Sequence, residues 1–458
     1  MMIEHKQEPE MARNLKNRHV QLIAIGGTIG TGLFLGSGKA INYAGPSIVL
    51  AYLITGIACF FLMRALGELL LSNLNYHSYV EFIREYLGET AGFVAGWTYW
   101  FCWVAIAMSE ITAVGLYIKF WLPQVPQWLP GLILLAILLL LNLITVGAFG
   151  ETEFWFALIK IVAILLLIGV GLFMIFTHYK TNAGHASFSN IINYGGFFPK
   201  GFKGFLFSFQ MVVFSFVGIE LVGLTASETQ DPDKVLPVAI DNIPIRIILF
   251  YVGALFVIIS IFPWNRVLPD QSPFVLVFQN VGIRAAADII NFVVITAAAS
   301  ACNSAVFSTG RMLYSLTYDT KSKLLKPLGT LSKQKVPAVA LVFSSVVIAI
   351  SVLLNIVIPE SVFTFITSVA TTTFIFIWGS IVVTHLRYKH SANSAKSIFK
   401  SPLFPFADYF VLVFLGIVLA VLLINRSTLT AAMASIIWLL IMTLLGIRHT
   451  HILKRTQS

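Results

Sequence analysis

The chain has 458 residues, of which 58% are hydrophobic and only 11% are charged. A soluble domain is about half apolar, so this composition excludes a water-soluble globular protein. Apolar stretches long enough to cross a hydrocarbon layer of about 30 Å recur between Val20 and Ile447. The net charge of +10 comes mainly from Lys and Arg in the short connections, which favours contact with anionic lipid and excludes nucleic acid as a partner.

The sequence also argues against several other classes of protein. It has no catalytic triad, metal-ligand spacing or phosphate-binding loop, so we predict no enzyme, no catalytic residues, no metal and no ATP-driven pump. The cysteines Cys59, Cys102 and Cys302 lie singly in apolar stretches, and we interpret them as packing residues. No organic cofactor and no obligate protein partner are predicted.

A hydropathy pass predicts an all-α polytopic membrane protein with about twelve transmembrane helices. Their centres are near Gly30, Ile57, Ala105, Leu138, Leu165, Phe214, Ala254, Ala299, Ser345, Ile375, Val413 and Trp438. An even number of spans puts both termini on one face, and most Lys and Arg of the connections fall on that face. By the positive-inside rule this face is cytoplasmic, and we predict a multi-pass protein of the bacterial inner membrane with N-in and C-in topology. The polar start of the chain, which has no signal sequence, agrees with that orientation.

Glycines interrupt the first predicted span near its middle, from Ile25 to Phe34. Each glycine costs a helix about 1 kcal/mol relative to Ala, so this density predicts a broken helix. Close helix packing is the alternative, and it explains Gly26 and Gly30 better than the tripeptide Gly30-Thr31-Gly32. A break exposes N–H groups that bind a carboxylate and carbonyls that accept from an ammonium group, so it can hold both ends of an amino acid zwitterion.

The second span carries Arg64 and Glu68 one helical turn apart near its cytoplasmic end, and this spacing predicts an ion pair. We interpret the pair as structural or as part of a gate, in preference to a substrate contact. The connection that follows, from Ser72 to Thr90, has the pattern of a short amphipathic helix at the cytoplasmic surface.

Two further charges fall inside predicted spans. Glu110, in the third span, has no neighbouring cation in the sequence, so we expect it to face a partner or a wet cavity, as a proton or substrate-pathway group or in a structural pair. Lys160 lies roughly two turns into the fifth span. One interpretation is a lysine that snorkels to the headgroups; the other is a desolvated amine that gains and loses a proton during transport.

The sixth span is interrupted from Phe214 to Glu220, again near its middle. Paired breaks in two halves of a chain are typical of inverted-repeat transporters, whose substrate lies where the halves meet. Glu220 ends this break and either lines the site or belongs to an inner gate. The next connection, Thr225 to Asn242, is rich in Asp and Pro, and we expect an ordered gate loop there.

Five motifs of this sequence resemble those of a known family. The motifs are Asn17 to Gly27, Ile29 to Phe34, Arg64 to Glu68, Phe154 to Lys160, and Ser215 to Glu220. Through them the sequence resembles the amino acid-polyamine-organocation superfamily, and specifically its bacterial amino acid transporter family, from about Leu15 to Lys389. Four further segments are most similar to permeases for D-serine, D-alanine and glycine: Thr98 to Trp103, Phe216 to Gly223, Ser272 to Val275, and Asn303 to Thr309. Permeases for proline, γ-aminobutyrate and aromatic amino acids share most of these motifs.

The resemblance implies a five-plus-five inverted repeat with discontinuous first and sixth helices and two additional C-terminal helices. The expected divisions are a cytoplasmic tail at 1–18, the repeats at 19–176 and 202–387, the last two helices at 406–447 and a tail at 448–458. Site roles are implied too: Gly30, Thr31 and Gly32 for the substrate carboxylate, Ile29 with the backbone of Phe214, Ser215, Phe216 and Val217 for the amine, and Lys160 at the position of a sodium ion. Glu110 departs from the aspartate of the most similar permeases.

The sequence therefore predicts a secondary active transporter that imports small neutral amino acids by proton symport, with Lys160 and Glu110 as proton-coupling residues and Glu220, Arg64 and Glu68 as gating residues. Phe214 and Phe216 are expected to crowd the side-chain pocket and so to favour a small substrate. The rival from another class is a sensor that binds an amino acid without moving it.

Overall fold

The computed structural model describes residues 29–74, 76, 78–144, 146–221, 232–280, 284–320, 322–359, 361–397 and 399–457. Within these ranges the chain is almost entirely helical, and the strands are a single short hairpin of β1 (Lys180–Thr181) and β2 (Gly184–His185). The predicted tail at 1–18, the first half of the first break and the connection from 222 to 231 lie outside the described residues.

Nine helices in the described ranges are long and apolar enough to cross a membrane. The longest single helices are α3 (Ile48–Ser72), α5 (Glu89–Ile118), α7 (Val146–Phe176), α15 (Arg284–Thr317), α16 (Ala338–Val357), α17 (Val362–Lys389), α18 (Phe406–Ile424) and α19 (Arg426–Gln457). Two shorter apolar helices, α6 (Trp128–Ile144) and α9 (Gly201–Phe214), stand at the predicted fourth and sixth spans. The continuous apolar segment Gly32–Ser72 holds the end of the first predicted span and all of the second, while the first predicted centre, Gly30, lies just before it.

The seventh predicted span is assembled from several short helices. It comprises α11 (Pro232–Asp241), α12 (Ile243–Arg246), the π-helix η3 (Ile247–Gly253) and α13 (Ala254–Ile261). In its described part the expected loop is instead a helix from Pro232 to Asp241, so the segment is ordered as predicted but is not a loop, and its role as a gate stays a prediction. Pro232 stands at the first position of α11, where a missing N–H costs no helical hydrogen bond, so proline there starts a helix instead of preventing one.

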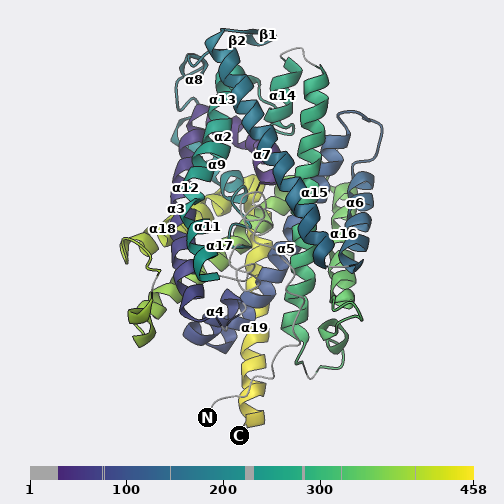
Figure 1. Cartoon of the computed structure of the whole chain (residues 1–458), viewed down its shortest axis with the longest axis vertical. Coiled ribbons are helices and arrows are strands. Elements are labelled where there is room, and N and C mark those ends of the chain that lie inside the picture. The colour runs from purple at the N-terminus through teal and green to yellow at the C-terminus, as the bar shows by residue number, and fades with distance from the viewer. Residues whose placement is uncertain are drawn as a thin grey trace.

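The short elements lie mainly at the two ends of the molecule. In Figure 1, α4 (Tyr79–Leu87) lies toward the end where the C-terminus is marked, and β1, β2 and α8 (Asn190–Asn193) lie at the opposite end. The predicted amphipathic helix is confirmed as α4: a capping box between Ser78 and Glu81 starts it, and Tyr79, Val80, Phe82 and Ile83 are buried. The other short helices are α14 (Pro273–Asn280), η2 (Gly45–Ser47), η4 (Trp264–Arg266), η5 (Lys326–Gly329) and η6 (Ala392–Lys396).

The centre of the molecule is the packing of α5 against α15. On α15, the small residues Ala297, Ala298, Ala301 and Ala305 are all buried. Small side chains let two helix backbones approach closely, which is how helices associate in lipid. This contact holds the two helices that carry Glu110 and the neighbours of Lys160 beside the broken segments.

Of the two predicted interruptions, the one in the sixth span lies within the described residues, whereas only the part of the first from Ile29 onward does. Ile29 and Gly30 are not helical, and the π-helix η1 (Gly32–Gly36) and α2 (Ser37–Ala44) follow them. In the sixth span α9 ends at Phe214, and residues 215–220 form turns in which Gly218 has a φ of +91°. The predicted fold class, an all-α polytopic membrane protein, is confirmed. The division into two repeats at the stated boundaries stays a prediction.

Candidate functional site

The first and sixth breaks touch each other through their backbones. A Cβ atom added to Gly32 would lie 2.6 Å from the Cα atom of Ser215 and 3.2 Å from a ring carbon of Phe214. Contacts that short with backbone cannot be relieved by a side-chain rotation. A glycine is therefore needed at this position for the two breaks to come together. The sequence left two explanations for the glycines of the first span, close packing and a broken helix, and Gly32 is consistent with both.

A small cavity lies where the two breaks meet, with a volume of about 20 Å³. It is lined by Gly30, Gly32, Trp103, Ile106, Glu110, Phe214, Val217 and Ala301. Five of the predicted site residues thus share one cavity, while Ile29, Thr31, Ser215 and Phe216 do not line it. Since the cavity is smaller than an amino acid, a substrate of that size requires the side chains or helices around it to move.

Glu110 lies where the first break exposes its backbone donors. The backbone N–H of Thr31 donates to the Glu110 carboxylate, with N···O distances of 3.3 and 3.4 Å, and the Thr31 hydroxyl donates to Oε1 at 3.0 Å. The carboxylate also lies close to the backbone, because a Cβ on Gly30 would be only 2.8 Å from Oε1. The start of this half-helix therefore binds a carboxylate, as helix starts do, and here the carboxylate belongs to the protein.

Lys160 does not snorkel toward a headgroup. Its side chain is fully buried, and Nζ donates to the Ile29 carbonyl at 3.2 Å and to Ser300 Oγ at 3.0 Å. The lysine thus links α7 to the first break and to α15. A buried ammonium group needs anionic partners, and the carboxylates of Glu110 and Glu153 interact with it electrostatically.

Glu153 is a member of the site that the sequence reasoning missed. It is fully buried, and it accepts from Ser300 Oγ at 2.7 Å and from Asn303 Nδ2 at 3.1 Å. A signal was present, because Glu153 and Lys160 are seven positions apart and therefore lie on the same face of one helix. Ser300 and Asn303 had no such signal, since they approach from a helix that is distant in sequence.

Two tyrosines hold the sixth break in place. Tyr52 Oη and Ser215 Oγ are 2.8 Å apart, and Tyr251 Oη donates to the Ser215 carbonyl at 3.2 Å. The Phe216 ring stacks on Tyr251 with centroids 4.8 Å apart and an interplanar angle of 14°. Ser215 and Phe216 thus contact Tyr52 and Tyr251. Of Phe214 and Phe216, which were both expected to crowd the side-chain pocket, only Phe214 lines the cavity.

Glu220 is fully buried outside the cavity lining. Its carboxylate accepts from Tyr99 Oη at 3.3 Å and from Trp378 Nε1 at 3.2 Å. The end of the sixth break is therefore tied to α5 and α17. Glu220 therefore does not line this cavity, and of its two predicted roles the one in an inner gate stays a prediction.

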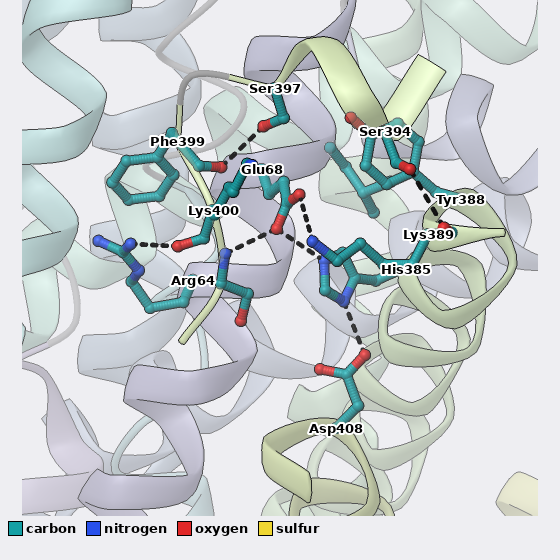
Figure 2. Close-up of polar contacts among 12 residues, drawn as sticks. Arg64, Glu68, His385, Tyr388, Lys389, Ser394, Ser397, Phe399, Lys400 and Asp408 are labelled. Carbon is teal, nitrogen blue, oxygen red and sulfur yellow. Dashed lines mark hydrogen bonds and ion pairs between the residues drawn. The ribbon is translucent and has the colours of Figure 1, made fainter. Parts of the chain in front are cut away.

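The predicted ion pair between Arg64 and Glu68 is wrong. Arg64 Nη1 bonds Asp241 Oδ1 at 2.6 Å, its Nη2 donates to the Lys400 carbonyl, and its guanidinium carbon lies 3.8 Å from the Phe399 ring centroid. Figure 2 shows Arg64 beside Phe399 and the Lys400 carbonyl, on one side of Glu68. The helical spacing is right, but segments distant in sequence offer both side chains closer partners than they offer each other.

Glu68 instead belongs to a buried cluster at one end of α3, α17 and α18 (Figure 2). Glu68 Oε1 lies 2.8 Å from Lys389 Nζ, and Oε2 lies 3.1 Å from His385 Nε2 and accepts from the Ser401 backbone N–H at 2.6 Å. The other ring nitrogen of His385 lies 2.7 Å from Asp408 Oδ2. The cluster joins three helices through charges that are removed from water.

Comparison with known proteins matches residues 19–457 to the family model described as amino acid permease. The chain is 57% identical to the amino-acid permease AapA of Bacillus subtilis (strain 168), over 96% of this chain and 95% of the relative. It is 50% identical to the D-serine/D-alanine/glycine transporter of Escherichia coli (strain K12), over 94% and 92%. It is 46% identical to the DL-alanine permease SerP2 of Lactococcus lactis subsp. cremoris (strain MG1363), over 96% and 95%.

Proposed function

Because this chain belongs to the amino acid permease family, within the superfamily that the sequence motifs indicated, we propose that it imports small neutral amino acids by proton symport. The family consists of transporters and not of enzymes, and the chain is a multi-pass membrane protein. The proposed substrates are alanine, glycine, D-serine and D-alanine. The proposed orientation, from the charge of the connections, has both termini in the cytoplasm.

The observation that carries the proposal is the meeting of the two breaks beside a buried carboxylate and a buried amine. Gly32 lies against Ser215, and Glu110 lines the same cavity as both breaks. Lys160 bonds the Ile29 carbonyl at the edge of the first break. The arrangement places peptide groups that can bind a zwitterion beside ionisable groups that can bind a proton.

Substrate binding follows from the donors that Glu110 now uses. The carboxylate of an incoming amino acid takes the Thr31 N–H and hydroxyl, so Glu110 must leave them. A carboxylate that loses two hydrogen bonds in a buried cavity is best accommodated by taking up a proton. Competition between two carboxylates for the same donors thereby links substrate binding to proton binding.

The aromatic lining supports a small substrate. Trp103 and Phe214 line the cavity, and their rings limit the room that a substrate side chain would have there. The relatives named for D-serine, D-alanine, glycine and DL-alanine support the same class. Proline, γ-aminobutyrate and aromatic amino acids are the sibling substrates that must be tested against it.

The test is uptake of radiolabelled alanine into proteoliposomes with an imposed inward pH gradient. We expect accumulation that an uncoupler abolishes and that unlabelled glycine, D-serine and D-alanine compete for, while proline, γ-aminobutyrate and phenylalanine do not. Accumulation that ignores the gradient contradicts symport. Binding without any uptake supports a sensor, and competition by proline or phenylalanine alone supports a sibling permease.

A further inference from the structure

Glu153 is a fully buried carboxylate that has no task in the transport cycle proposed above. Burying an ionised carboxylate is costly unless partners compensate it, and the partners of Glu153 include hydroxyl groups, the Asn303 amide and, at longer range, the Lys160 ammonium group. A carboxylate placed so close to a group with a proposed role in proton transfer calls for a functional explanation.

The Ser300 hydroxyl forms a direct bridge between the two ionisable groups. It accepts from Lys160 Nζ at 3.0 Å and donates to Glu153 Oε2 at 2.7 Å. A hydroxyl group has both a donor hydrogen and acceptor lone pairs, so it can receive one proton while it releases another. Both distances are those of ordinary hydrogen bonds, and all three side chains are fully buried.

The two ends of this bridge, Lys160 and Glu153, lie at different heights along α7. Glu153 precedes Lys160 by seven residues of α7, which corresponds to roughly 10 Å along a helix axis. The end of α7 at Phe176 is followed by β1, which lies at the end of the molecule opposite α4 in Figure 1. Glu153 is therefore nearer than Lys160 to the end that contains α4, the end proposed to be cytoplasmic.

We propose that Ser300 and Glu153 form the inner proton exit of the transporter, with Glu153 as the acceptor of the proton carried by Lys160. This inference rests on the proposed proton symport. A proton passes from Lys160 Nζ to Ser300 Oγ while the hydroxyl proton of Ser300 passes to Glu153 Oε2. Lys160 becomes a neutral amine, Glu153 becomes a carboxylic acid, and Ser300 is unchanged.

The surrounding groups are compatible with this transfer. Glu153 on the same helix and Glu110 on α5 interact electrostatically with Lys160, while α15 contributes the Ser300 hydroxyl that bonds its Nζ. Transfer converts an ammonium–carboxylate pair into two neutral groups, which a buried site accommodates readily. Asn303 Nδ2 donates to Oε1 of Glu153, the oxygen that does not receive the proton, and Asn142 Nδ2 donates to Asn303 Oδ1 at 2.8 Å, which holds that amide in place.

The experiment compares two transport modes of the full-length protein in proteoliposomes. One is accumulation of radiolabelled alanine driven by a pH gradient, and the other is alanine counterflow without a gradient. Counterflow returns the carrier loaded with substrate and proton, so it does not require proton release to the cytoplasmic side. A defect in the exit therefore reduces accumulation much more than counterflow.

The key variants are S300A, which removes the bridging hydroxyl, and E153Q, which removes the acceptor. Each is expected to lower gradient-driven accumulation by roughly tenfold or more while counterflow falls much less. S300T keeps a hydroxyl and is expected to retain accumulation. The matched control is S435A, because Ser435 is equally buried but its hydroxyl bonds only to a carbonyl of its own helix, that of Ala431.

Three results overturn the inference. Unchanged accumulation in both S300A and E153Q removes the relay while leaving proton symport intact. An equal loss of accumulation and counterflow in E153Q, together with a lower thermal midpoint, makes Glu153 a structural counter-ion only. If the wild-type protein takes up alanine without responding to the gradient, the proposed symport fails first and the relay fails with it.

Discussion

At the scale of single residues, Glu110 is the side chain whose contacts say most about substrate binding. It receives two donors from Thr31, one from the backbone and one from the hydroxyl, and it lines the cavity between the breaks. A protein carboxylate in the position expected for a substrate carboxylate is an internal competitor. Removing its charge should therefore affect binding and coupling in opposite directions.

For E110Q we expect tighter substrate binding and a loss of gradient-driven accumulation. The amide still accepts from Thr31, but a hydrogen bond to a neutral acceptor is weaker than one to a charged acceptor by about 1 kcal/mol, which corresponds to a fivefold to tenfold lower half-saturation constant. The measurement is counterflow at a series of alanine concentrations, with accumulation measured in the same vesicles. A higher half-saturation constant with intact accumulation would show that Glu110 binds the substrate and does not compete with it.

Lys160 provides the second prediction at this scale. K160A removes the ammonium group between Glu110 and Glu153, and we expect pH-driven uptake to be abolished while some exchange remains. It also leaves two buried carboxylates without their cation, a change that typically costs about 3–5 kcal/mol, so a lower thermal midpoint is expected. The variant K160A/E153Q should recover part of that loss of stability but none of the uptake. Unchanged proton-driven accumulation in K160A removes this lysine from the mechanism.

At the scale of elements, the feature that matters is the contact between the two broken segments. Gly32 is the position where this contact is closest, because its missing side chain faces the backbone of Ser215. Gly416 in α18 is a useful contrast, since a Cβ there would have no neighbour within 4 Å. The same chemical change therefore tests the contact at one position and only helix propensity at the other.

We expect G32A to reduce transport by at least an order of magnitude and G416A to leave it unchanged. At Gly32 a new methyl group 2.6 Å from a backbone atom must push the breaks apart, and displacement of a binding site by about 1 Å can cost roughly a hundredfold in rate. At Gly416 the alanine should stabilise the helix by up to about 1 kcal/mol. Uptake rates per molecule of monodisperse protein give the comparison. If both variants transport equally well, the close contact between the breaks is not required for transport.

The elements also show which features of this protein can be predicted from its sequence. The sixth break was predictable because glycine and small residues in the middle of an apolar span weaken a helix locally, and α9 indeed ends at Phe214. Glu110 was predictable as a buried charge, but its partner Thr31 is 79 positions away. The partners of Glu68 are more than 300 positions away, and for that reason the helical spacing to Arg64 was misleading. Local patterns predict where the chain breaks, whereas partners across the bundle require the fold.

At the scale of the whole molecule, two charge clusters bind distant helices together near one end of α3. In one, Glu68 contacts Lys389 and His385, and all three side chains are buried or nearly so. In the other, Arg64 pairs with Asp241, whose side chain is 55% exposed. Both contacts tie α3 to another part of the bundle, but only the first does so away from water.

This difference predicts unequal effects of two matched substitutions on stability. E68Q leaves the Lys389 ammonium group and the His385 ring facing a neutral amide, and breaking a buried pair from one side typically costs about 3–5 kcal/mol. D241N removes an exposed ion pair, which is worth about 1 kcal/mol or less. Thermal unfolding in the same detergent should therefore show a much larger fall in midpoint for E68Q.

Transport by the folded fraction then separates a structural cluster from a gate. His385 has a carboxylate oxygen at each ring nitrogen, and two ionised carboxylates are both satisfied only when each nitrogen carries a proton. If this cluster opens and closes during the cycle, E68Q and H385Q change the counterflow rate per folded molecule, because the closed state loses its charged contacts. If it only braces α3, α17 and α18, both variants lower the thermal midpoint and leave that rate unaltered. Equal midpoints for E68Q, D241N and the wild type would contradict both roles, since a buried ion pair cannot be broken without a cost.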